Sequence, residues 1–345
     1  MFFKPFEGYG FNKAHAASYG KVAYQTAYMK ANFPAIYMSA VLTADSGDVE
    51  KIGETISECK RMGIPVLPPD VNESFEGFTV VKSERVAKSK EREEHRDKIR
   101  FGLTTIKNFG EGIAHVIIEE RKRAGKFKSL GNFLERVEDK NLNKKSLESL
   151  IKAGALDSFG ERGVMLANLE QLLQYHKEFA AGTKNQSSLF GESSNADNLR
   201  LTPAAAATQA DKLLWEKELL GLYISGHPLD KFKSVLEKRA VNIKHVKEEY
   251  REGMAVVLGG IIEELKPIMT KGNEQMAFLK LADLSGSVET VVFPRVFTEF
   301  KNLLVPEACI AVKGRVSNRN GEISILVEKI KKLDLPSVAP EKSTD

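Results

Sequence analysis

The chain is poor in the residues that disulfide-bonded, metal-binding and membrane-spanning proteins need. It has two cysteines in 345 residues, Cys59 and Cys309, which lie far apart and show no metal-ligand spacing. A disulfide scaffold is therefore disfavoured, and a reducing cytosol fits the composition. No apolar run approaches the roughly 18 residues of a membrane span, and residues 1–7 lack the features of a signal peptide. We expect a cytoplasmic protein without membrane contacts.

Several catalytic signatures are missing as well. Two-metal polymerase or nuclease chemistry needs converging carboxylates, and no Asp-x-Asp occurs in the chain. A Walker loop, His-Glu-x-x-His and Gly-x-Ser-x-Gly are also absent, and the six histidines are scattered. We therefore expect no catalytic residue, no metal site and no cofactor bound by this chain.

What is present describes a soluble globular protein of two to four small domains. Hydrophobic residues make up 42% of the chain and charged residues 28%. The net charge is only +4, but residues 82–145 hold 18 basic against 11 acidic groups. Such a concentrated basic excess is typical of a phosphate-binding surface. For the part from Lys82 to Lys98, a solvated charged loop is the better interpretation.

Hydrophobic periodicity divides the chain into a helical and a β-rich part. Residues 64–70 read as an extended connector, and 75–81 and 99–103 as short strands. Capping and breaking residues, including Asp48, Pro34 and Gly63, support the helix limits. The predicted helices span 14–32, 35–43, the segment between Asp48 and Gly63, 114–123, 144–152, 161–180, 211–221 and 230–239.

From Met254 the hydrophobic period changes to two. One helical stretch, 296–304, lies between the third and fourth of five predicted strands. This order matches the OB fold, a small Greek-key barrel. The predicted strands span 255–265, 276–283, 288–293, 309–316 and 322–330.

A glycine pair marks a possible phosphate site. Gly110 and Gly112 stand at a predicted helix start, where a tight turn exposes backbone N–H groups that attract anions. This is typical of the helix-hairpin-helix motif, which binds a nucleic-acid backbone without reading bases; an ordinary turn is the alternative. A similar unit with one glycine follows about 44 residues later, and its role is expected to be mainly structural. The predicted duplex-binding residues are Lys107, Gly110, Gly112, Arg121, Lys122, Arg123 and Gly154.

The predicted barrel carries an outward aromatic residue beside a lysine. Strand alternation puts Leu279 and Leu281 on the core face and Phe278 and Lys280 on the opposite face. Such a pair suits stacking on a base and neutralising its phosphate, although a neighbouring domain could cover the ring instead. The predicted single-strand-binding residues are Phe278, Lys280, Phe293, Arg295 and Arg315.

Residues 181–210 form a low-complexity linker that contains one apolar pair, Leu189-Phe190. Polar flexible sequence around an apolar pair suits a short linear motif that binds a pocket on a partner. Packing of the pair onto a neighbouring domain is equally compatible with the residues.

Several longer runs resemble one family. Residues 8–19 and 23–31, then 64–70 and 220–229, are similar in content and order to blocks of the alpha subunit of bacterial DNA polymerase III, a C-family replicative polymerase. The resemblance extends from Gly8 to Leu333. It implies a multidomain α+β chain with a mostly helical fingers portion, a tandem helix-hairpin-helix domain and a five-stranded OB-fold β-barrel.

The resemblance also implies domain limits and binding roles. Asn12, Lys13 and His15 match the segment that lines the incoming-nucleotide pocket. Gln186, Leu189 and Phe190 match the motif that docks on the sliding clamp. The implied segments are distal fingers 1–103 with a charged insertion near 82–98, hairpin domain 104–180, linker 181–210, helical connector 211–252, OB domain 253–333 and a disordered tail 334–345.

The departures from the family limit the expected activity. The palm with its Mg²⁺-binding aspartates, the thumb and the phosphoesterase-like domain have no counterpart in these residues. We therefore expect a fragment that binds primer-template duplex, single-stranded template, the sliding clamp and other replisome subunits, and is inactive alone. The alternatives are an independent nucleotidyltransferase, which the missing acid pair disfavours, and a scaffold whose OB barrel binds protein or RNA.

Overall fold

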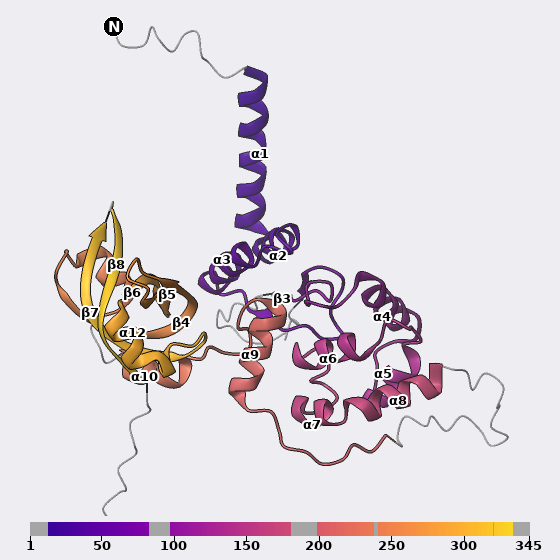
Figure 1. Cartoon of the computed structure of the whole chain (residues 1–345). Coiled ribbons are helices and arrows are strands. Elements are labelled where there is room, and N and C mark those ends of the chain that lie inside the picture. Colours follow the sequence, from indigo (N-terminus) through magenta and orange to yellow (C-terminus); the bar gives the residue numbers. More distant parts are fainter. Residues whose placement is uncertain (1–12, 83–96, 181–198, 238–240, 320, 334–345) are drawn as a thin grey trace, which may run out of the picture. The chain divides into compact units, whose positions relative to one another are not determined.

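The computed structural model describes residues 13–82, 97–180, 199–237, 241–319 and 321–333. The chain divides between Ser225 and Gly226 into two compact units (Figure 1). The first is mostly helical and the second is a closed β-barrel, so the expected α+β architecture is confirmed. Among the described residues, no helix combines the length and the apolar content that crossing a membrane would take.

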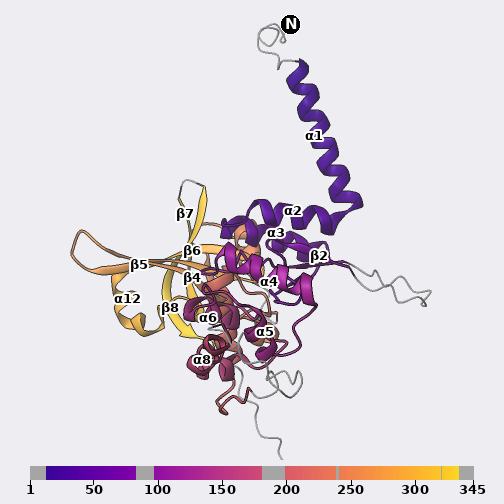
Figure 2. The same ribbon diagram turned by 90° about the vertical axis from the view of Figure 1, so that its right-hand side faces the viewer.

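The first unit begins with three helices, α1 (Lys13–Asn32), α2 (Pro34–Ala44) and α3 (Val49–Arg61). The Asp48 carboxylate caps α3 by accepting a hydrogen bond from the backbone N–H of Lys51 at 3.2 Å. Helix α2 contributes Leu42 to the core, whereas α1 has no buried residue. Lys30, near the end of α1, pairs with Glu58 of α3 at 2.9 Å, and Figure 2 shows α1 meeting α2 at this end.

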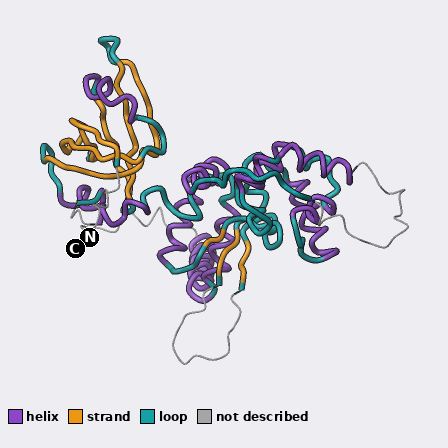
Figure 3. The backbone as a smooth tube through the Cα atoms, turned by 90° about the horizontal axis from the view of Figure 1, so that it is seen from below, coloured by secondary structure: helices purple, strands orange, loops and turns teal. Residues whose placement is uncertain are grey.

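A small sheet follows, formed by β1 (Val66–Leu67), β2 (Thr79–Val81) and β3 (Lys98–Arg100) in the order β1-β3-β2. The two strands expected over 75–81 and 99–103 are present in shorter form. β1 lies in the segment expected to be a connector, and it pairs in parallel with β3. Figure 3 shows these three short strands side by side, next to helices of the first unit.

The hairpin region contains α4 (Glu111–Ala124), α5 (Leu130–Arg136), α6 (Lys144–Lys152), α7 (Arg162–Ala167) and α8 (Leu169–Ala180). α6 has the predicted limits, and α5 was not predicted. The helix expected over 161–180 is interrupted at Asn168. The side-chain amide of Asn168 donates to the carbonyl of Thr202 at 2.9 Å, and its oxygen accepts from the Thr202 N–H at 2.9 Å.

One apolar core runs through the whole first unit. Phe101, Leu103, Ile106 and Phe109 belong to the same buried cluster, so packing is continuous across the expected limit at residue 103. α9 (Gln209–Leu220) also joins this cluster, through residues including Leu219. The first half of the expected connector is thus part of the first unit.

A buried ion pair holds α9 against the second hairpin, the turn at Gly154 between α6 and α7. Arg162 is 3% exposed and Glu216 is fully buried, and their side chains meet at 3.3 Å. The Arg162 guanidinium also donates to Asp157 and to the carbonyl of Lys152. The second oxygen of Glu216 accepts the N–H groups of Ile224 and Ser225 at 3.0 and 2.9 Å. The pair therefore connects three chain segments.

The second unit begins with short helices, η4 (Asp230–Phe232), α10 (Lys233–Glu237) and α11 (Ile243–Glu249). All five predicted strands form, and they close in the order β4-β5-β6-β8-β7. Helix α12 (Pro294–Phe300) and the turn η5 (Lys301–Leu303) lie between the third and fourth strands, as predicted. The strands are β4 (Ala255–Met269), β5 (Gln275–Asp283), β6 (Gly286–Val292), β7 (Cys309–Arg319) and β8 (Glu322–Lys332).

Breaking the buried ion pair should destabilise the first unit. We expect Arg162→Met to lower the free energy of unfolding by about 3–5 kcal/mol, because Glu216 would keep a buried charge without its cation. The single tryptophan, Trp215, lies on α9 and reports unfolding in denaturant by its fluorescence. Arg61→Met, at an exposed ion pair with Glu58, is the matched control and should leave the free energy of unfolding nearly unchanged. Equal losses in the two variants would contradict the role of the pair.

Candidate nucleic-acid interface

The first hairpin is a turn that leads into α4. Asn108, with φ of 66°, takes the left-handed conformation in this turn. Phe109 is buried beside it, and the backbone N–H of Lys107 donates to the carbonyl of Leu219 at 2.9 Å. The apolar anchor and the bond to α9 fix the turn, so the start of α4 has a defined position.

Neither glycine of this hairpin is required by the fold. Gly110, the N-cap of α4, has φ of −80°, and Gly112 is not in the left-handed region. A Cβ added at either position would meet no atom of the described structure within 4 Å. The space before the first N–H groups of α4 is therefore open. Open space at glycine is what a closely approaching backbone or phosphate needs.

Gly154 of the second hairpin is the opposite case. Its φ is +83°, and an added Cβ would lie 2.3 Å from Nη2 of Arg162. Both the backbone conformation and the guanidinium packed over it require glycine. The structure therefore explains Gly154 by packing, whereas its predicted role in duplex binding stays a prediction.

The predicted basic residues do not gather at one place. Lys107 precedes the glycines, whereas Lys122 and Arg123 lie in the last turn of α4, about 15 Å along the helix axis from Gly112. Lys122 pairs with Glu119 at 2.8 Å and Arg123 with Glu120 at 2.7 Å. Lys107 has no carboxylate partner among the described residues. It is thus the cation best placed for a ligand at the start of α4.

Arg121 differs from what we expected of it. It is 9% exposed, and its guanidinium donates to the carbonyl of Val71 at 2.8 Å and lies 4.8 Å from the centre of the Phe75 ring. Burial lowers the pKa of this guanidinium, and Asp70 and Glu73 oppose that effect. Arg121 joins the loop at residues 71–75 to α4 from the inside, so it does not lie on the surface with its neighbours.

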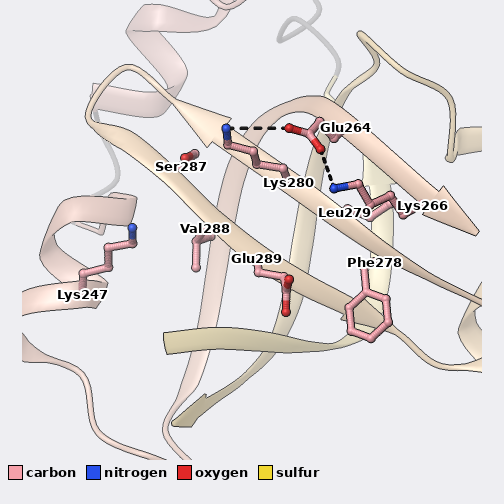
Figure 4. A pocket seen from close by; sticks show the side chains of 9 residues that line it. All are labelled: Lys247, Glu264, Lys266, Phe278, Leu279, Lys280, Ser287, Val288 and Glu289. Carbon is pink, nitrogen blue, oxygen red and sulfur yellow. Dashed lines mark ion pairs between the residues drawn. The ribbon is translucent and has the colours of Figure 1, made fainter. Parts of the chain in front are cut away.

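On the barrel, the outward face of β5 has the predicted alternation. Leu279 and Leu281 are buried, and Phe278 and Lys280 point outward. Strand pairing adds neighbours that the sequence did not indicate: Lys280 lies between Glu264 of β4 and Glu289 of β6, and Phe278 lies opposite Lys266. These side chains line a cavity of about 320 Å³ (Figure 4).

Carboxylates neutralise the lysines on one side of this cavity. Lys266 is 3.0 Å from Glu264, and Lys280 is 3.6 Å from Glu263 and 3.9 Å from Glu264. The hydrogen bond and charge of Lys266 lower the pKa of the Glu264 carboxyl. A β-bulge between Ile262 and Glu264 lets two consecutive glutamates lie on the exposed side. Lys280 is therefore partly neutralised.

The other predicted barrel residues are dispersed. Phe293 is 44% exposed and follows β6 directly, and Arg295 lies in the first turn of α12. Neither lines the cavity. Arg315 lies on β7, opposite Ala255, where its Nε donates to Glu328 of β8 at 2.9 Å. It is outside the face formed by β5 and β6.

Among the remaining predicted residues, Lys13 and His15 are exposed on α1, and the His15 ring lies 4.3 Å from that of Tyr19. The predicted nucleotide-binding Asn12 and clamp-binding Gln186, Leu189 and Phe190 lie outside the described residues, as do most of the charged insertion and the tail 334–345. No cluster of three or more potential metal ligands occurs in the described part of the chain.

Sequence reasoning missed the acidic half of the barrel face, Glu263, Glu264 and Glu289, together with Lys247 and Lys266. These residues come from α11 and from strands on either side of β5. Charged residues at alternating positions of adjacent predicted strands were the available signal, but they indicate a cluster only when the strand register is known.

Two family models match the two regions. A helix-hairpin-helix motif model matches residues 63–164, and an OB-fold nucleic acid binding domain model matches residues 256–333. The first model begins before the limit expected at residue 104, in agreement with the continuous core.

Over nearly its whole length, the chain is similar to subunits of one kind of protein. The chain is 38% identical over 339 residues to the DNA polymerase III subunit alpha of Thermus aquaticus, covering 97% of this chain and 26% of that protein. It is 38% identical over 335 residues to the subunit of Borreliella burgdorferi, covering 95% of this chain and 28% of that protein. It is 36% identical over 360 residues to the subunit of Saccharopolyspora erythraea, covering 99% of this chain and 28% of that protein. The chain thus spans about a quarter of the length of these relatives.

The two hairpins give opposite expectations for the same substitution. Gly112→Ala should leave the free energy of unfolding unchanged or raise it by up to about 1 kcal/mol, since alanine favours a helix and meets no atom there. Gly154→Ala should lower it by more than about 1 kcal/mol, because of the positive φ and the clash with Arg162. Denaturant titration followed by Trp215 fluorescence measures both. A loss of stability in Gly112→Ala would contradict the claim that a Cβ at this position meets no other atom.

Proposed function

The chain is homologous over nearly its whole length to the C-terminal region of the DNA polymerase III alpha subunit, and on that basis we propose that it holds DNA for template-directed synthesis. The observation that carries the proposal is the open space at Gly110 and Gly112, within the helix-hairpin-helix match. The chain supplies contacts to DNA in the cytoplasm, and the polymerisation chemistry resides in another part of the full-length subunit.

Duplex DNA binds at the start of α4. A phosphate accepts hydrogen bonds from the first N–H groups of the helix, and Lys107 neutralises its charge. Such contacts are independent of base sequence. The second hairpin supports this surface from within, because Arg162 fills the space at Gly154 and connects it to α9.

Single-stranded template binds on the barrel face of β5 and β6. This is the face on which OB folds bind oligonucleotides. Phe278 offers its ring for stacking and Lys280 neutralises phosphate, once its ion pairs with Glu263 and Glu264 exchange for contacts with the strand. The proposal names Phe293 and Arg295 as further contacts near the end of β6.

The N-terminal region serves the incoming nucleotide, with Lys13 and His15 on α1 next to Asn12. Their lysine and imidazole groups suit a triphosphate. Mg²⁺ belongs, in this proposal, to aspartates of the palm of the full-length subunit.

A clamp-binding role for Gln186, Leu189 and Phe190 completes the proposal. The chain on both sides of residues 181–198 is fixed to the hairpin region: α8 belongs to its core, and the Gln171 side chain donates to the carbonyl of Arg200 at 2.9 Å. In this proposal, a clamp bound by the motif is tethered to the unit that holds the duplex. Such tethering raises the effective concentration of the clamp near DNA.

Salt dependence tests the duplex-binding surface. We expect log affinity for primed DNA to fall linearly with log salt, and Lys107→Gln to make the slope shallower by about 0.9, the contribution of one phosphate contact. Fluorescence anisotropy over a salt series measures the slope. Lys51→Gln, in an exposed pair with Asp48 on α3, is the charge-matched control and should retain the wild-type slope. A flat salt response of the wild-type protein would exclude phosphate binding by the basic stretch.

Clamp binding is tested by Leu189→Ala combined with Phe190→Ala. We expect at least tenfold weaker binding to purified sliding clamp, because two apolar anchors are lost from a short motif. Surface plasmon resonance measures the affinity. Ser187→Ala with Ser188→Ala changes the same stretch without removing the anchors and should bind normally. Unchanged affinity in the Leu-Phe variant would end the clamp proposal and leave the hairpin proposal intact.

A further inference from the structure

One carboxylate of the barrel face differs from the others in its surroundings. Glu263 and Glu264 are paired with Lys280 and Lys266. Glu289, directly opposite Lys280 on β6, is exposed and has no cation within ion-pair distance among the described residues. A surface that binds phosphates loses affinity by keeping an unneutralised carboxylate, so its presence calls for a specific contact.

The position of Glu289 suits contact with a base. Phe278 is two residues from Lys280 on the same face of β5, so it is the diagonal neighbour of Glu289. Figure 4 shows the Phe278 ring and the Glu289 carboxylate projecting toward the same side of the sheet. Both line the cavity of about 320 Å³. A base stacked on the ring would thus present its edge to a group that only accepts hydrogen bonds.

The opposite side of the cavity is basic. Lys247 of α11 also lines it and has no carboxylate partner among the described residues. Ser287 of β6 also lines the cavity and offers a hydroxyl group. An aromatic ring, an acceptor and an unpaired cation therefore surround one space, and they match the base and the phosphate of one nucleotide.

We propose that this cavity binds one unpaired nucleotide and that Glu289 makes it select bases with an exocyclic amino group. Cytosine presents its N4 amine to the carboxylate, whereas thymine presents the O4 oxygen at the same position and is repelled. The binding is reversible and involves no covalent step. This inference rests on the proposed single-strand binding by the barrel, and it adds base selectivity to that site.

The test compares deoxycytidine and deoxythymidine homopolymers of equal length, above neutral pH, by fluorescence anisotropy with the full chain. The wild-type protein should bind the cytosine polymer roughly fivefold more tightly, because Glu289 accepts a hydrogen bond from the cytosine amine and repels the thymine oxygen. Glu289→Gln should bring the ratio to about one, mainly by tighter binding of the thymine polymer, since an amide donates as well as accepts.

Two controls separate the inference from its premise. Glu299→Gln removes an exposed carboxylate of α12 outside the cavity and should keep the wild-type ratio. Phe278→Ala and Lys280→Gln should weaken the binding of both polymers. A wild-type ratio near one, or a preference that survives in Glu289→Gln, would overturn base selection while leaving single-strand binding in place. Unchanged binding in both Phe278→Ala and Lys280→Gln would overturn the premise and the inference together.

Discussion

The organisation of the first unit depends on one buried guanidinium. Arg162 starts α7, yet its side chain reaches Asp157 in the second hairpin, the carbonyl of Lys152 at the end of α6, and Glu216 in α9. A buried charge is tolerated because each of these groups satisfies it. Glu216 in turn fixes the chain at Ile224 and Ser225, where the first unit ends. One ion pair thus sets the position of α9 relative to the hairpins.

This arrangement explains why two similar hairpins differ in role. In the second, the space beside the glycine is filled by Arg162, so the hairpin is a structural joint. In the first, the fold is completed by Phe109 and by the bond from Lys107 to Leu219 of α9, and the space beside the glycines stays open. The second hairpin and α9 together hold the first hairpin in place. Rigid support of this kind keeps the backbone donors of α4 in place, as the proposed phosphate contact requires.

On the barrel face, the distribution of charge determines what a ligand meets. Its lysines are partly neutralised by Glu263 and Glu264, so the free protein does not carry a bare cationic face. A strand of nucleic acid has to exchange these ion pairs for its own phosphates, and that exchange moderates affinity. Basic residues of α4 are paired in a similar way, Lys122 with Glu119 and Arg123 with Glu120.

The sequence by itself determined the local elements and the kind of protein. Period-two and helical patterns are carried by neighbouring residues, so α6, the five barrel strands and the outward pair Phe278 and Lys280 could be predicted. Tertiary structure alone decided which distant residues meet. It put Arg121 inside, gave the two-residue β1 its partner, and surrounded Lys280 with Glu264 and Glu289. Strand register and burial depend on packing between segments far apart in the chain, and no local pattern encodes that packing.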